Sequence, residues 1–226
     1  LQLKLLPQLS DFADRADIAA RCEPAESVGG DFYHLFRLGE GRLGVMLGDV
    51  SSHGYSAGLI MALTMSAASL VVQDGDRPGD VLRGIHRELV RKLESTEMYM
   101  TLCYVVLDPS RNLLRYANAG HPHAFRIGSE VADRLDALNP PLGIAEFDAY
   151  EERELSWFRG EDILLLFTDG LSETIREDQL WSDDIIIETV REHLTSEAGT
   201  LLEELFTIAS PGQTPLADDR TALVVK

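Results

Sequence analysis

The chain has 226 residues, of which 45% are hydrophobic and 26% charged, and its 38 acidic side chains outnumber 20 basic ones to give a formal net charge of -18. A chain of this length and composition can bury a core of its own, so its folding requires neither disulfide bonds nor a structural metal. The excess negative charge argues against binding to nucleic acid or contact with an anionic membrane.

The two cysteines, Cys22 and Cys103, lie in separate apolar stretches, and the sequence has no CxxC motif or Cys/His cluster. This arrangement argues against a zinc site, and two unpaired thiols are typical of a reducing compartment, so a cytoplasmic location is expected. No apolar run is expected to be long enough to span a membrane, and no secretory signal is evident. The Leu-rich residues 1–10 are expected to be the helical end of a linker from an upstream segment.

The first half of the chain alternates short extended stretches with two longer helical ones. Gly-rich turns separate the extended stretches, and the second helical stretch begins with Pro78 in its first turn. The patterns predict strands over residues 17–24, 31–38 and 42–49, followed by helices over residues 55–73 and 78–94.

The second half is dominated by strands. They are predicted over residues 100–107, 113–118, 124–127, 151–156, 162–168 and 221–225, with helices over 183–194 and 198–209 before the last strand. Because most of these strands are joined by short turns, the sheets should be antiparallel, with the helices outside them. No linker-like break interrupts the pattern, so residues 1–226 are predicted to form a single α+β domain.

Four places share one local pattern, in which an aspartate lies at the end of a strand, usually beside glycine. Any one of them alone is better explained as an ordinary turn, because Asp-Gly and Gly-Asp are common turn dipeptides. Four such sites on different strands instead suggest carboxylates converging at one end of a sheet. The four sequences are Gly29-Gly30-Asp31, Gly48-Asp49-Val50, Thr168-Asp169-Gly170 and Asp218-Asp219-Arg220-Thr221.

Converging carboxylates would need a counter-charge. Two unit charges about 4 Å apart repel by roughly 4 kcal/mol at an effective dielectric constant near 20. Oxygen ligands without sulfur or an obligatory histidine favour hard ions such as Mg2+ or Mn2+. Two such ions bridged by one carboxylate form an arrangement that activates water for phosphate ester hydrolysis.

Seven ordered blocks of the sequence resemble the SpoIIE/RsbU branch of the PPM-type protein serine/threonine phosphatases. The blocks are VGGDFYHLF, GDVSSHGYSAGLIMA, TLCYVVLD, LRYANAGHPHAF, NPPLGI, LLLFTDGLSET and ADDRTALVV. The resemblance covers almost the whole chain, and it implies an αββα sandwich of two mainly antiparallel sheets flanked by helices.

The resemblance also implies roles for residues near the first two blocks. Asp49 matches the aspartate that bridges both metals and holds the catalytic hydroxide, and Val50 matches the residue whose carbonyl binds one of them. Asp31 matches an early aspartate that holds the cluster directly or through water, so Asp31 and Asp49 are the candidate catalytic residues.

The remaining metal ligands are implied near the end of the chain. Asp169 and Asp218 match ligands of the second Mn2+ or Mg2+ ion. Asp219 lies beside Asp218 and could support that ligand or replace it.

The sequence departs from the family pattern at two positions, neither of which is a predicted ligand, and two histidines lie near the candidate site. Ser52 stands where the family commonly has glycine, and His34 ends a block that usually ends in aspartate. His53, near the candidate bridging aspartate, could act in acid catalysis or form a local structural hydrogen bond. His121 is better explained as a turn residue.

The resemblance implies hydrolysis of phosphoserine or phosphothreonine on a regulatory protein, usually a phosphorylated anti-sigma-factor antagonist, under the control of an upstream sensor domain. A homodimer is also considered. The alternative is a catalytically silent binding module, although retention of all the aspartates argues against it. A receiver-type signalling domain is disfavoured because its regular strand–helix alternation is not present in the predicted elements.

Overall fold

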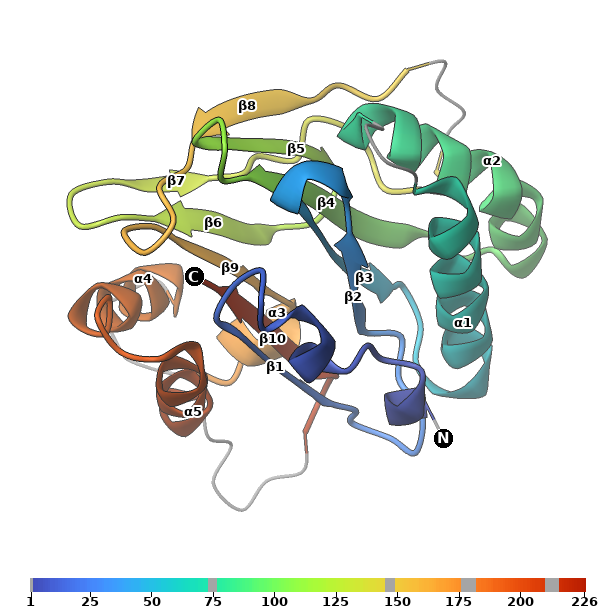
Figure 1. Cartoon of the computed structure of the whole chain (residues 1–226). Helices are drawn as coiled ribbons and strands as arrows, with labels where there is room; N and C mark the ends of the chain where they lie inside the picture. The colour runs from blue at the N-terminus through green and yellow to red at the C-terminus, as the bar shows by residue number, and fades with distance from the viewer. Residues whose placement is uncertain (1, 73–76, 145–148, 176–181, 210–215) are drawn as a thin grey trace.

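The computed structural model describes residues 2–72, 77–144, 149–175, 182–209 and 216–226, and it places two five-stranded sheets between two layers of helices (Figure 1). One sheet has the strand order β2-β3-β4-β5-β8 and the other β1-β10-β9-β6-β7. The pairings between named strands are antiparallel. The predicted αββα sandwich is therefore confirmed.

The described strands match the predicted ones closely, with the addition of the short strand β7. They are β1 (Ile18–Glu23), β2 (Phe32–Arg37), β3 (Leu43–Val50), β4 (Met100–Asp108), β5 (Leu113–Ala119), β6 (His123–Ile127), β7 (Ala132–Arg134), β8 (Arg153–Ser156), β9 (Ile163–Phe167) and β10 (Arg220–Val225).

The helices fall into two groups on opposite outer faces (Figure 1). The four predicted helices are present, together with a short helical turn, α3. Their bounds are α1 (Gly54–Val71), α2 (Pro78–Thr96), α3 (Asp169–Ser172), α4 (Ser182–Glu192) and α5 (Ala198–Ile208).

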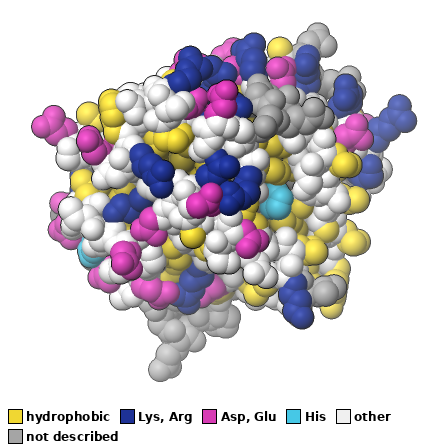
Figure 2. All heavy atoms as spheres, in the orientation of Figure 1, with side chains coloured by type: hydrophobic (Ala, Val, Ile, Leu, Met, Phe, Trp, Pro, Cys, Tyr) yellow, Lys and Arg dark blue, Asp and Glu magenta, His cyan; other side chains and the backbone are white. Residues whose placement is uncertain are grey.

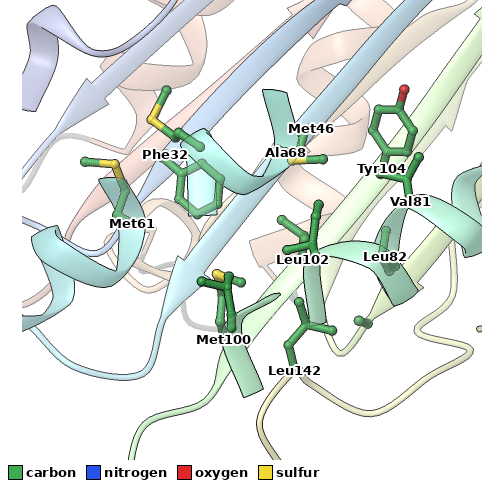
Figure 3. Close-up of a cluster of buried hydrophobic side chains, with 14 of the residues drawn as sticks. Phe32, Met46, Met61, Ala68, Val81, Leu82, Met100, Leu102, Tyr104 and Leu142 are labelled. Atoms are coloured by element: carbon green, nitrogen blue, oxygen red, sulfur yellow. The ribbon is translucent and has the colours of Figure 1, made fainter. Parts of the chain in front are cut away.

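Alternation along the strands builds the layers. Within β4, Leu102, Tyr104 and Val106 face the α1–α2 layer. Cys103 and its alternate neighbours on the same strand instead enter the core between the sheets. Successive strand side chains point to opposite faces, so one apolar strand contributes to two cores. Figure 3 shows the first of these cores, where α1 and α2 cover the sheet.

A third core lies under the other helical layer. Phe167 from β9 and Val224 from β10 pack there against Leu201 and Leu205 of α5. The neighbouring strand residues Leu166 and Leu223 point the other way, into the core between the sheets. The sandwich thus has three apolar layers of packing between its four structural layers.

Helix α1 corrects one expectation from the sequence. Its 18 residues are long and apolar enough, by length and composition alone, to cross a membrane, with a mean hydropathy of 1.4. One face of the helix, including Ile60 and Met61, is nevertheless buried against the sheet. Tyr55, Leu59 and Leu70 lie on the exposed side. The apolar composition therefore reflects both core packing and an uncovered outer face.

The start of the chain also differs from expectation. Residues 1–10 were expected to continue a helix, but the described part forms two short 3-10 helices, η1 (Gln2–Lys4) and η2 (Leu9–Phe12). Pro7 lies between them, and its ring disfavours helical geometry at the preceding residue. Leu6 and Phe12 pack into the domain, so this stretch forms part of the folded unit.

The outer surface carries charges of both signs. On the face shown in Figure 2, Lys and Arg side chains are interspersed with Asp and Glu side chains, without forming one continuous basic area. A third 3-10 helix, η3 (Gly39–Gly41), makes the turn between β2 and β3.

Candidate metal centre

Asp49 and Val50 end strand β3, directly before the loop that leads into α1. Asp49 pairs across the ladder with Thr101 of β4, and the Val50 carbonyl accepts the Ser52 N–H at 2.5 Å, which turns the chain sharply. A Cβ atom on Gly30 would lie only 2.8 Å from the Val50 carbonyl oxygen. Glycine at position 30 therefore permits the chain before Asp31 to pass close to this turn.

Asp169 and Asp218 come from segments that pack directly on each other. Asp169 begins α3, and its Oδ1 accepts the Gly170 N–H at 3.0 Å. A Cβ atom on Gly170 would lie 2.1 Å from the Asp219 carbonyl oxygen, so the absence of a side chain allows the contact. Asp218 precedes β10, and its Oδ1 accepts the Asp219 N–H at 2.8 Å.

A single cavity of about 500 Å³ collects three of the predicted carboxylates, Asp49, Asp169 and Asp218. They come from three strand ends that are far apart in the sequence, as the four-site pattern predicted. The lining consists of Asp49, Val50, Ser51, Ser52, His53, Tyr99, Thr101, Gly120, His121, Pro122, Pro141, Thr168, Asp169 and Asp218.

Asp31 is buried behind this cavity, with only 1% of its surface exposed. Its Oδ2 accepts the Thr168 hydroxyl at 2.7 Å, and the Thr168 hydroxyl oxygen in turn accepts the Thr221 N–H at 3.0 Å. Asp31 also interacts directly with the Asp49 carboxyl group. The structure thus places Asp31 against the candidate bridging residue, fixed by a hydroxyl from the β9 end.

Asp219 is also buried, but its carboxylate points into a loop. Its Oδ1 accepts the Ala25 N–H at 2.8 Å, and its Oδ2 accepts the N–H groups of Gly30 at 2.7 Å and Asp31 at 3.4 Å. Since both oxygens are occupied by backbone donors, these bonds favour the supporting role over the ligand role for Asp219. Asp218 and Asp219 are therefore adjacent in sequence but face different surroundings.

Crowding of carboxylates changes their acidity. Burial, together with repulsion from Asp169 and Asp218, raises the pKa of Asp49 to about 7. Burial and the neighbouring Asp49 carboxyl raise the pKa of Asp31 well above its ordinary value, and burial raises the pKa of Asp218. A bound cation would favour the charged form of each group, so the donor set fits a hard divalent ion.

The ligands do not form a finished coordination shell. Across the described ranges, no three Asp, Glu, His or Cys side chains lie close enough together to hold a metal ion as they stand.

The two histidines of the cavity have different surroundings. His121 is buried; its Nε2 donates to the Phe167 carbonyl at 3.0 Å, and its Nδ1 accepts the Thr101 hydroxyl at 3.2 Å. Burial lowers the pKa of His121 to about 3, so it is neutral and braces the cavity wall. His53 is largely exposed, with its Nδ1 3.2 Å from the Glu26 carboxylate. This contact agrees with the local structural role considered for His53.

Some contributors were missed at the sequence level. Thr168 immediately precedes Asp169 in the quoted TDG block, so its position was a usable signal, although its bond to Asp31 was not foreseeable. Tyr99 and Thr101 line the cavity from the start of β4, and only the folded arrangement reveals this.

Comparison with known proteins decides the family. The sequence profile of the family described as Stage II sporulation protein E (SpoIIE) matches residues 39–226, most of the chain. The chain belongs to the SpoIIE family. This SpoIIE-family chain is 25% identical over 213 residues to the phosphoserine phosphatase RsbU of Bacillus subtilis (strain 168), covering 93% of this chain and 63% of RsbU. The chain thus spans less than two thirds of that relative's length.

Solved structures place the fold of the SpoIIE-family chain among PP2C domains. The SiaA-PP2C domain of Pseudomonas aeruginosa superposes with a TM-score of 0.86 at 21% identity, covering 100% of this chain and 92% of that one. The catalytic domain of the serine/threonine protein phosphatase PstP, solved in complex with two manganese ions, gives a TM-score of 0.68 at 17% identity, with 92% and 96% covered. At these identities the likeness concerns the fold.

Proposed function

We propose that this domain hydrolyses phosphoserine or phosphothreonine esters on a regulatory protein, using two Mn2+ or Mg2+ ions held at the cavity. The observation that carries the proposal is the convergence of Asp49, Asp169 and Asp218 on one cavity, from three separate strand ends. The name of the relative RsbU, a phosphoserine phosphatase, and the two manganese ions of PstP support the same chemistry.

In this proposal, Asp49 and the Val50 carbonyl hold the ions at the end of β3, and Asp169 and Asp218 hold them from the opposite wall. When bound, such ions supply an activated water and neutralise charge on the phosphoryl oxygens. Asp31 orients Asp49 through their direct contact, and Thr168 fixes Asp31 by hydrogen bonding. Asp219 holds the backbone that carries Asp31.

The lining of the cavity gives an independent reason to expect metal dependence. Among the described residues that line it, none is Lys or Arg. A phosphate ester carries up to two negative charges near neutral pH, and it would enter a cavity that already holds three carboxylates. Without cations, the protein itself offers little to offset this repulsion.

The substrate and its regulation follow from the family resemblance. We propose a phosphorylated anti-sigma-factor antagonist as the protein substrate, and an upstream sensor domain in the same protein as the source of control. The exposed apolar side of α1, formed by Tyr55, Leu59, Leu63 and Leu70, supports a homodimer. The free thiols of Cys22 and Cys103 support a cytoplasmic location.

The test is turnover of para-nitrophenyl phosphate and of phosphoserine, phosphothreonine and phosphotyrosine peptides, with millimolar Mn2+ and with EDTA. Activity is expected only with the metal, and on phosphoserine and phosphothreonine rather than phosphotyrosine. Full activity in EDTA would refute the two-metal site. Binding of the phosphopeptides without turnover in Mn2+ would favour the alternative of a catalytically silent binding module.

A further inference from the structure

Gln2 is a buried polar residue whose contacts lie at the candidate metal centre, far from its place in the sequence. Only 7% of its surface is exposed. Its Oε1 accepts the Gly29 N–H at 2.8 Å, and its Nε2 donates to the carbonyls of Gly29 at 3.0 Å and Asp31 at 3.3 Å. The side-chain amide thus bonds to Gly29 in both directions, as a neighbouring strand would.

The segment that carries Gln2 is itself anchored in the domain. We call residues 2–12 the N-terminal segment. Leu6 packs against two of the apolar cores, and Phe12 is buried in the core between the sheets. Gln2 also holds its own turn, since its carbonyl accepts the Leu5 N–H at 2.8 Å. The position of the Gln2 amide is therefore set by packing further along the segment.

The backbone that Gln2 holds is the connection between β1 and β2, residues 24–31, called here the Asp31 loop. It has no strand or helix of its own, so its backbone groups need partners from elsewhere. Asp219 accepts N–H groups of Ala25, Gly30 and Asp31 from one direction. Gln2 contributes from another, at Gly29 and at the Asp31 carbonyl.

The Asp31 loop also contacts the start of α1. The Val28 carbonyl accepts the Gly54 N–H at 3.2 Å, and a Cβ atom on Gly58 would lie 2.2 Å from a methyl carbon of Val28. The loop is therefore packed closely against the helix that follows Asp49 and Val50. A displacement of the loop would disturb both Asp31 and the β3–α1 turn.

We propose that Gln2 is a positioning residue for the metal centre, and that the N-terminal segment controls metal affinity by holding or releasing the Asp31 loop. This inference rests on the proposed metal-dependent function. Gln2 is not among the residues that line the cavity, so it acts through the backbone of Gly29 and Asp31. Of the two side chains that bond to this backbone, Gln2 and Asp219, only Asp219 would remain after the Gln2 amide is removed.

The test compares Mn2+ binding by isothermal titration calorimetry for the full chain and for Gln2→Ala, Gln2→Glu and Gln8→Ala. Partners that orient metal ligands typically change metal affinity by about 10–100-fold when removed, so Gln2→Ala is expected to weaken Mn2+ binding by roughly tenfold or more. Gln2→Glu keeps an acceptor for the Gly29 N–H but sets a carboxylate against two carbonyls, so it should weaken binding as well. Gln8 is exposed on the same segment, and Gln8→Ala should bind as the wild type does.

A second measurement follows the loop without metal or substrate. Amide hydrogen exchange at Gly29, Gly30 and Asp31, measured in EDTA, should be faster in Gln2→Ala than in the wild type and unchanged in Gln8→Ala. Thermal melting in EDTA checks that the variants remain folded. At saturating Mn2+, the phosphatase activity of Gln2→Ala should recover, because the ligands themselves are intact.

The outcomes separate the two proposals. If the wild type binds Mn2+ and Gln2→Ala binds it with the same affinity, the positioning role is wrong while the proposed function stands. Unchanged exchange at Gly29–Asp31 in Gln2→Ala would likewise overturn the positioning role. If the wild type itself does not bind Mn2+, the proposed function fails, and the inference about Gln2 fails with it.

Discussion

The acidic residues of the candidate centre occupy two regions that differ in surroundings more than in chemistry. The cavity wall holds Asp49, Asp169 and Asp218, whose carboxylates face open space. The buried layer behind it holds Asp31 and Asp219, whose carboxylates accept hydrogen bonds from Thr168 and from backbone amides. Aspartate therefore has two roles in this region: on the wall the carboxylates repel one another, and behind it they accept hydrogen bonds that hold the surrounding backbone.

From this difference we expect the wall carboxylates to matter mainly for activity and the buried carboxylates mainly for stability. A carboxylate on the wall is destabilising without a cation, because it adds like charge to a crowded site. In the buried layer, the Asp219 carboxylate stabilises the fold, because the backbone N–H groups that it accepts would otherwise be unsatisfied. Substitutions in the two regions should therefore separate the two properties.

The largest effect is expected for Asp49→Asn on the wall. Loss of a candidate bridging ligand should remove several kcal/mol of transition-state stabilisation, which corresponds to about a thousandfold or more in turnover. The melting temperature of the metal-free protein should stay the same or rise, because one repelling charge is gone. Steady-state turnover in Mn2+ and thermal melting in EDTA measure the two effects, with the exposed Asp11→Asn as control. Turnover near the wild-type level would refute the role assigned to Asp49.

The next effect concerns the two adjacent aspartates, one in each region. Asp219→Ala leaves the Ala25 and Gly30 N–H groups without their partner, at a cost of about 2 kcal/mol, so the melting temperature should fall by roughly 4–8 °C. Asp218→Ala removes only a local bond to the next N–H and should leave the melting temperature nearly unchanged, while turnover falls. Melting and turnover measured on both variants check this contrast. Equal melting temperatures would show that the two regions do not differ as described.

A third effect is a dependence of metal-free stability on pH. The pKa of Asp49 is raised from 3.8 to about 7 on folding, so between these values the folded state keeps a proton that the unfolded state has lost. The unfolded state then binds fewer protons, and the free energy of unfolding falls as pH rises through this window. In EDTA, the stability lost between pH 4 and 7 should be smaller in Asp49→Asn than in the wild type. Identical urea-unfolding profiles across this range would contradict the raised pKa.

Much of the fold was predictable because most strands and helices have a recognisable pattern of apolar residues in their own sequence. The short apolar runs of β4 and β9 identify strands, and the helical spacing of Leu82, Ile85 and Leu89 identifies α2. Short turns between strands imply antiparallel pairing. Strand β7 was missed because three residues carry too little pattern. The prediction of a helix over residues 1–10 was wrong. The leucines suggested a helix, but with Pro7 in the segment and Leu6 packed against two cores, the chain forms two 3-10 helices instead.

The candidate site was predictable in part. The aspartates at the ends of β3 and β9 and before β10 were found from sequence, and the structure brings Asp49, Asp169 and Asp218 to one cavity. Their roles as ligands stay predictions until metal binding is measured. The acidity of Asp49 and the contact between Asp31 and Thr168 depend on segments more than a hundred residues apart, which no local pattern records.

By itself, the sequence determined the helices and strands in chain order and the positions where carboxylates end strands, because each depends on the period or the chemistry of a few consecutive residues. The layers of the sandwich were implied by the family resemblance. Only the tertiary structure decided that Asp218 faces the cavity while Asp219 faces the Asp31 loop, and that Gln2 reaches that loop across 27 residues of chain. The direction in which a side chain points, and the group that it contacts, depend on how the whole chain packs. Two neighbouring aspartates have the same local chemistry, and the backbone turn before β10 gives them different surroundings.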